Sequence, residues 1–192
     1  ALPEPVVSVA VGASHTCVVQ ADAAARCWGS NTKAELGQGH LESRGAQAGD
    51  MSSIPAVKLG GLVSSFQIAA GGCHTCAVVH GLVKCWGCGG EGQLGTGALV
   101  ESAGGEEGTA LTAANAGMEP AVAVAAAGTT TCYVGGSGGL YCWGQSGWLG
   151  EPAAAPRRVP LPAASVRVAC SPAHCCAVDT AGLVRCWGDG AQ

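Results

Sequence analysis

The chain has 192 residues, a formal net charge of -4, 32 glycines and 12 cysteines, and only 11 percent of its residues are charged. The few Lys and Arg residues form no basic stripe that would neutralise phosphates, so nucleic acid and anionic membranes are poor candidate partners. The longest uninterrupted apolar run, residues 121–127, is far shorter than the ~20 residues of a membrane helix, which argues against membrane insertion of this segment. Glycine and small apolar residues favour short strands and turns over long helices.

Four segments of the chain share one pattern. They begin at residues 9, 68, 124 and 166 and read "VAVGASHTCVVQADAAARCWGS", "IAAGGCHTCAVVHGLVKCWGC", "VAAAGTTTCYVGGSGGLYCWGQ" and "VRVACSPAHCCAVDTAGLVRCWGD". Each one predicts an apolar strand centred on a cysteine, a polar or glycine turn, and a second strand that ends in Cys-Trp-Gly. Three of the segments are followed by a related tail, "KAELGQG", "EGQLGTG" or "SGWLGEP".

The repeats predict an all-β, disulfide-rich chain that forms one repeat domain over residues 1–192. The repeats cover about 6–53, 54–118, 119–163 and 164–192, and the last is truncated. The segments near 40–53 and 99–118 do not match the pattern, so we expect loop insertions there.

The pattern resembles the repeats of the regulator of chromosome condensation family, whose units carry a glycine-histidine strand, a "WG" strand and a "GQLG" turn and form a seven-bladed β-propeller. The paired cysteines are not general to that family but resemble its extracellular variants, including the ectodomains of Crinkly-type plant receptor kinases. The resemblance implies about four β-propeller blades. Because a seven-bladed ring at this repeat length needs nearly twice as many residues, we expect a partial ring or a fragment of a larger propeller.

One cysteine pair recurs in every repeat. In an antiparallel hairpin, facing residues have a constant sum of residue numbers, and this register places two cysteines opposite each other in each repeat. Facing Cβ atoms are within reach of a disulfide after small adjustment. The predicted inner disulfides are Cys17–Cys27, Cys76–Cys85, Cys132–Cys142 and Cys176–Cys186.

The second repeat holds two further cysteines, so residues 73–88 contain two Cys-x-x-Cys pairs that on their own would suit a zinc ion. The other three repeats keep the inner pair with too few companions for zinc, so we predict an outer disulfide, Cys73–Cys88, and no metal site. Positions 73 and 76 point to opposite faces of an ideal strand, and a bulge near Gly72 or Gly87 would relieve this. The remaining cysteines predict a Cys170–Cys175 bond around Ser171-Pro172.

Other residues offer alternative chemistry. His15, His74 and His174 share one repeat position and could suggest a metal ring, but the resemblance favours a structural role for them. The tryptophans after the second cysteine are expected to pack between blades. Candidate binding residues are Trp148, which replaces Gln in the third tail, and the loop carboxylates Glu101, Glu106 and Glu107.

We expect a non-catalytic extracellular module for protein recognition or assembly, located at the cell surface, in the cell wall or matrix, or in the secretory-pathway lumen. No cofactor is expected. Its partner would be another protein or further copies of the chain, with a glycan as a possible ligand. The alternative hypotheses are a guanine-nucleotide-exchange or chromatin-binding propeller, as in the founding family member, and a zinc-binding protein or metal-dependent enzyme that uses the histidines and the four-cysteine window.

Overall fold

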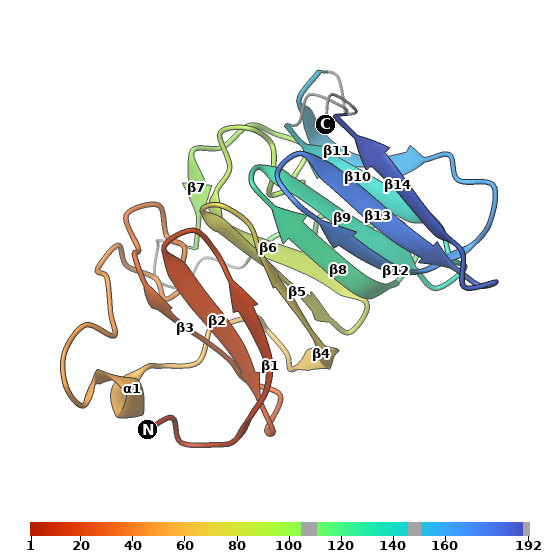
Figure 1. The fold of residues 1–192 in the computed structure, drawn as a ribbon. Helices are drawn as coiled ribbons and strands as arrows, with labels where there is room; N and C mark the ends of the chain where they lie inside the picture. The colour runs from red at the N-terminus through yellow and green to blue at the C-terminus, as the bar shows by residue number, and fades with distance from the viewer. Residues whose placement is uncertain (105–110, 146–150, 190–192) are drawn as a thin grey trace.

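The computed structural model of the chain describes residues 1–104, 111–145 and 151–189, and it is an all-β fold of four antiparallel sheets (Figure 1). The first sheet contains β1 (Val6–Val11), β2 (His15–Gln20) and β3 (Ala25–Gly29). The second contains β4 (Val63–Ala70), β5 (His74–Val79), β6 (Leu82–Cys88) and β7 (Ser102–Ala103). The third contains β8 (Ala121–Ala127), β9 (Thr130–Gly135), β10 (Leu140–Gly144) and β11 (Ala153–Val159), and the fourth contains β12 (Ser165–Cys170), β13 (His174–Asp179) and β14 (Val184–Gly188).

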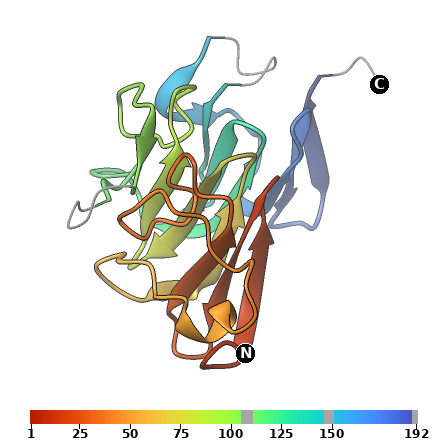
Figure 2. The same cartoon turned by 90° about the vertical axis from the view of Figure 1, so that its left-hand side faces the viewer.

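In every sheet the strands pair in chain order, so each sheet is an up-and-down blade. The blades stand side by side from the red N-terminal sheet at lower left to the blue C-terminal sheet at upper right of Figure 1. A short helix, α1 (Asp50–Ser53), lies in the connection that leaves the first blade. Figure 2 shows the orange and green connections of the first two blades extending on one side of the sheets, away from the fourth blade.

The segment of small residues that precedes each hairpin is itself a β-strand, which the sequence pattern did not identify. β1, β4, β8 and β12 each pair with the cysteine-centred strand that follows, and each pairing contains a register shift. These strands contain mostly Ala, Val and Ser, whose small size lets neighbouring blades approach closely.

The glycine of Cys-Trp-Gly has the same role in all four blades. Gly29, Gly87, Gly144 and Gly188 have positive φ angles of 108°, 96°, 95° and 149°. A Cβ at any of them would lie 2.0 to 2.5 Å from the backbone oxygen of the residue that precedes the paired strand of the same hairpin, for example 2.4 Å from the oxygen of Cys73. Only glycine permits both this backbone conformation and this close approach.

The hydrophobic core lies between the blades. One cluster joins the first and second blades, a second joins the second and third, and a third joins the third and fourth. In the second blade, Trp86 faces the first blade while the Cys76–Cys85 pair faces the third, because alternate strand residues point to opposite faces. The tryptophans of the second and third blades are fully buried, in agreement with the expected packing between blades. Along the described part of the chain, no helix combines the length and the apolarity that a membrane span requires.

Candidate functional site

The tail of one blade holds the tryptophan of the next. Leu36 and Leu94 of the first two tails are buried, and the indole Nε1–H groups of Trp86 and Trp143 donate to the backbone oxygens of Glu35 and Gln93, each at 2.8 Å. The glycine after each leucine has positive φ, and a Cβ there would lie within 3 Å of the indole ring. Each tail therefore fixes the spacing between neighbouring blades.

Two of the three histidines connect blades. His15 Nε2 and His74 Nε2 each lie 2.8 Å from a threonine Oγ1 of the following blade, Thr75 and Thr131 respectively. Thr131 Oγ1 in turn donates to the oxygen of Gln93 at 2.9 Å, so we assign the proton to His74 Nε2. Burial, and after it the charge of the nearby His15, lower the pKa of His74 from 6.5 to about 3, so its imidazole is neutral.

The third histidine of the set differs. His174 is exposed, and its Nδ1 lies 2.9 Å from Ser171 Oγ in its own blade. These contacts give each of the three histidines a structural partner, which is the role that the resemblance implied.

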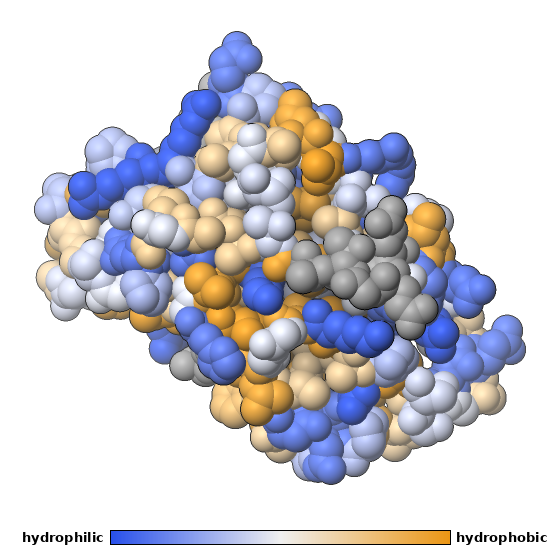
Figure 3. All heavy atoms as spheres, turned by 180° about the vertical axis from the view of Figure 1, so that it is seen from behind, coloured by the Kyte–Doolittle hydropathy of each residue, from blue (hydrophilic) through white to orange (hydrophobic). Residues whose placement is uncertain are grey.

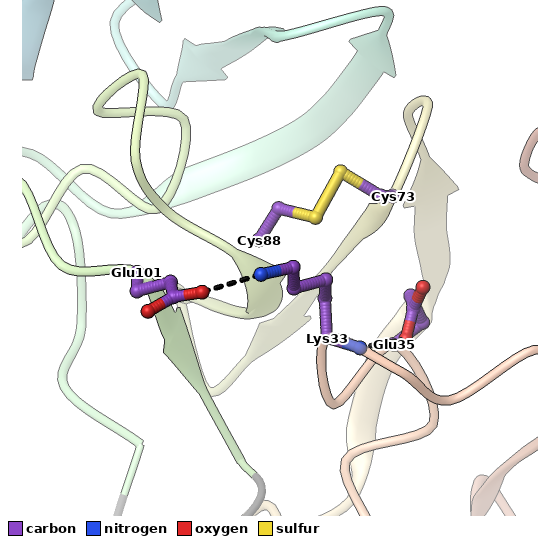
Figure 4. Close-up of polar contacts among 5 residues, drawn as sticks. All are labelled: Lys33, Glu35, Cys73, Cys88 and Glu101. Carbon is purple, nitrogen blue, oxygen red and sulfur yellow. Dashed lines mark hydrogen bonds and ion pairs between the residues drawn. A yellow bond between two sulfur atoms is a disulfide. The ribbon is translucent and has the colours of Figure 1, made fainter. Parts of the chain in front are cut away.

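The loops that leave the first two blades form a continuous surface, which we call the loop face and define as residues 31–44 and 89–104. The backbone N–H of Gly39 donates to the oxygen of Gly104 at 3.0 Å, and the ammonium group of Lys33 forms an ion pair with Glu101. Figure 4 shows Lys33 reaching from the first loop to Glu101. A further backbone bond of 2.8 Å runs from Gly97 to Ala154 in β11, so the loop face extends to the third blade.

Buried side chains and a disulfide position this surface. The Asn31 side chain is fully buried and donates to the backbone oxygens of His40 and Glu42 at 2.7 and 3.0 Å, which fixes the first loop. In the second loop, Cys88 pairs with Ser102 in the β6–β7 register. The Cys73–Cys88 bond thus anchors the strand next to Glu101 (Figure 4).

The ion pair also sets the electrostatics of the loop face. The hydrogen bond from Lys33, followed by its charge, lowers the pKa of the exposed Glu101 carboxyl. Beside the first loop, the polar side chains of Glu42, Arg44 and Asp50, with Ser43, Ser53 and Ile54, line a pocket of about 240 Å³. Figure 3, the view from behind, shows hydrophobic side chains in separate groups among hydrophilic ones.

Of the candidate binding residues, the structure places Glu101 on the loop face. Glu106, Glu107 and Trp148 lie outside the described residues. The sequence interpretation missed Lys33 and Asn31, although Asn31 stands only two residues beyond the Cys-Trp-Gly of the first repeat. Lys33 acts through Glu101, 68 residues away, and Asn31 through backbone oxygens 9 and 11 residues along its own loop. Repeat periodicity encodes neither contact.

All twelve cysteines are paired in the structure. The pairs are Cys17–Cys27, Cys73–Cys88, Cys76–Cys85, Cys132–Cys142, Cys170–Cys175 and Cys176–Cys186. The four-cysteine window contains no bulge in the β5–β6 pairing, so the hairpin holds both disulfides without the bulge near Gly72 or Gly87 that would have relieved the geometry. Instead, the inner rung has a Cα–Cα distance of 4.1 Å, and the outer rung spans 5.5 Å beside the bond from Cys88 N to Cys73 O. These are the spacings of non-hydrogen-bonded and hydrogen-bonded pairs.

Comparison with known proteins identifies the same kind of repeat that the sequence pattern resembles. Residues 6–35 match the family model of the regulator of chromosome condensation (RCC1) repeat. The RCC1 domain-containing protein RUG3, mitochondrial, of Arabidopsis thaliana is 33% identical over 147 residues, which are 76% of this chain and 30% of that protein.

Solved structures share the fold. Human WBSCR16 superposes with a TM-score of 0.79 at 24% identity, over 95% of this chain and 47% of its own. Yeast RCC1 (Prp20), solved with Kap60, gives 0.70 at 20% identity over 98% of this chain and 44% of its own. The CRINKLY WD40 ectodomain of the Arabidopsis thaliana receptor kinase ACR4 gives 0.57 at 18% identity over 98% of this chain and 51% of its own. The chain thus spans 30% of the curated relative and about half of these structures. Its sequence and fold identify it as a chain of regulator of chromosome condensation type repeats arranged as propeller blades.

Proposed function

We propose that the chain is a non-catalytic extracellular module that recognises another protein through the loop face. The observation that carries this proposal is the joining of loops from two blades by the Gly39–Gly104 backbone bond and the Lys33–Glu101 ion pair. Loops that are already ordered lose little conformational entropy when a partner binds, so a rigid, composite surface is suited to recognition.

The cysteines support the extracellular part of the proposal. Twelve cysteines in six disulfides are typical of chains that fold in an oxidising compartment. The small Ala, Val and Gly side chains of the blades bury little apolar surface each, so cross-strand bonds that hold the hairpin register add stability where the core adds less. The likeness to the ACR4 ectodomain is at 18% identity and supports the fold alone.

A charge-reversal pair tests the loop face. Glu42 and Glu91 are exposed residues of the two loops, whereas Glu4 and Asp22 are exposed near the opposite ends of the strands. Wild-type protein secreted from cells is screened against an array of secreted proteins and cell-surface ectodomains. We expect a partner whose affinity falls at least ~10-fold with Glu42→Lys/Glu91→Lys and stays within about 2-fold with Glu4→Lys/Asp22→Lys, which makes the same change in net charge. Equal effects of the two variants, or no partner on the array, would contradict the proposal.

A second candidate function is that of the founding family member, nucleotide exchange or chromatin binding. It is favoured by the fold match to Prp20p, whose structure is described together with its binding to Gsp1p and histones. A pull-down with purified Gsp1p and histones distinguishes the two candidates. Binding of either would favour this second function over an extracellular one.

A further inference from the structure

The junction between the third and fourth blades differs from the other two. At the first two junctions a histidine of one blade bonds to a threonine of the next. At the third junction both partners are replaced, because Thr130 stands at the histidine position and Cys175 at the threonine position. The polar contact is absent from this junction among the described residues, and sulfur atoms take its place.

Three sulfur atoms meet there. Cys132 Sγ lies 3.9 Å from Cys175 Sγ and 3.8 Å from Cys170 Sγ, and the three sulfurs lie within 4.8 Å of one another. This is the only group of three or more potential metal ligands found among the described residues. Cys142, bonded to Cys132, places a fourth sulfur beside this group, though not within 4.8 Å of all three, so two facing blades contribute two cysteines each.

Two sulfur–sulfur distances across the junction match those of a metal site. With zinc–sulfur bonds of ~2.3 Å, the sulfurs of a tetrahedral site lie about 3.8 Å apart. The contacts of Cys132 with Cys170 and Cys175 already have this length. On reduction, the bonded pairs within each blade have to separate and Cys142 Sγ, which lies outside the group of three, has to approach the fourth blade. Three of the four cysteines, Cys132, Cys142 and Cys175, are each 0% exposed, and Cys170 is partly buried.

Basic residues share the faces that meet at this junction. Arg157 pairs with Cys142 in the β10–β11 register and Arg185 pairs with Ala177 in the β13–β14 register, so both begin on the sheet faces that carry the cluster. Arg185 also forms an ion pair with the buried Asp179, so the exposed Arg157 is the guanidinium group that would offset part of the negative charge of a zinc ion bound by four thiolates.

We propose that these four cysteines form a zinc-binding site when their two disulfides are reduced. A phosphine reductant and one water convert each disulfide to two thiols and one phosphine oxide. The four thiols then bind one Zn²⁺ and release four protons. The site lies at the blade junction, and the four-cysteine window of residues 73–88 is not part of it.

The test uses cobalt as a spectroscopic probe for zinc. Wild-type protein is reduced with a phosphine under nitrogen, titrated with Co²⁺, and compared with Cys170→Ser/Cys175→Ser and with the matched control Cys73→Ser/Cys88→Ser. We expect wild type and control to bind one Co²⁺ with the visible absorption of tetrahedral cobalt thiolate, and Zn²⁺ to displace it. The oxidised protein should show no such absorption.

The junction variant keeps two of four ligands, so we expect it to lose the tetrahedral absorption and to bind Zn²⁺ at least ~100-fold more weakly. Circular dichroism of each reduced sample, with and without Zn²⁺, reports folding. Loss of the absorption in the Cys73→Ser/Cys88→Ser control with retention in the junction variant would assign zinc to the window and overturn the proposal. A reduced wild-type chain that lacks strand structure even with Zn²⁺ would overturn it as well. Neither result bears on the loop face.

Discussion

Replacing Thr131 by valine isolates the contact between the second and third blades. Valine has nearly the shape of threonine, so packing changes little while one hydroxyl is lost. That hydroxyl accepts the proton of His74 Nε2 at 2.8 Å and donates to the oxygen of Gln93 at 2.9 Å. Gln93 keeps its bond from Trp143, but the N–H of His74 is left without a partner in a fully buried site.

The expected loss follows from that unpaired group. Leaving a buried donor unsatisfied costs about 1–3 kcal/mol. Moving the proton to Nδ1 gives no relief, because His74 Nδ1 is buried and has no hydrogen-bond partner among the described residues. We therefore expect the free energy of unfolding to fall by roughly 2 kcal/mol.

Thr16→Val is the matched control. Thr16 occupies the same repeat position, since it pairs with Trp28 as Thr131 pairs with Trp143, but no blade precedes the first in the described structure. We expect a change within about 0.5 kcal/mol for this half-buried residue. Guanidinium unfolding of the oxidised proteins, followed by circular dichroism, measures both. Equal unfolding midpoints for the two variants would refute the role assigned to the contact between blades.

Three further predictions concern the cysteines, the buried histidine and the recurring glycine. Thiol titration of the denatured protein should find no free thiol before reduction and twelve after it, and several free thiols before reduction would contradict the disulfides. Because the pKa of His74 is about 3 when folded and 6.5 ordinarily, protons bind the unfolded chain more strongly. The contribution of His74 to stability should therefore be fully present above pH 6.5, and the free energy of unfolding should fall towards pH 3 by up to ~1.4 kcal/mol per pH unit. Unfolding curves of His74→Gln should show a shallower decline over the same pH range. Gly182 has a φ of 80° and open space around a Cβ, so Gly182→Ala should lower the free energy of unfolding by about 1 kcal/mol. In Gly144→Ala the Cβ would lie 2.0 Å from the Thr129 oxygen, so this variant should lose at least ~2 kcal/mol more. Equal shifts of the melting temperature for the two variants would contradict the close-approach argument.

Much of the fold followed from repetition in the sequence. Two-residue periodicity and a constant sum of residue numbers place Cys76 opposite Cys85, and the His80–Gly81 turn of that hairpin has positive φ at both residues, as a tight turn requires. Such pairings are local, so nearby residues determine them. The first strand of each blade was harder to identify, because runs of Ala, Val and Ser give a weak pattern and their partners are recognised only in the sheet.

The loop face could be predicted only in part. Glu101 was a candidate because it is a carboxylate in a glycine-rich insertion, but nothing near it in sequence indicates Lys33, 68 residues away. The pairing arises because the loops that follow the third strands of two consecutive blades meet.

The repeat and the hairpin register were evident from the amino-acid sequence, since both depend on residues within a single hairpin. The need for glycine after each tryptophan was recognised from the backbone, where a Cβ would meet the paired strand. Which residues meet between blades could be seen only in the folded chain, because face-to-face stacking of the sheets joins residues 38 to 57 positions apart. Stacking joins His74 to Thr131 and brings Cys132 to Cys170 and Cys175, and it moves the candidate metal site from the conspicuous four-cysteine window to a junction that no motif marks.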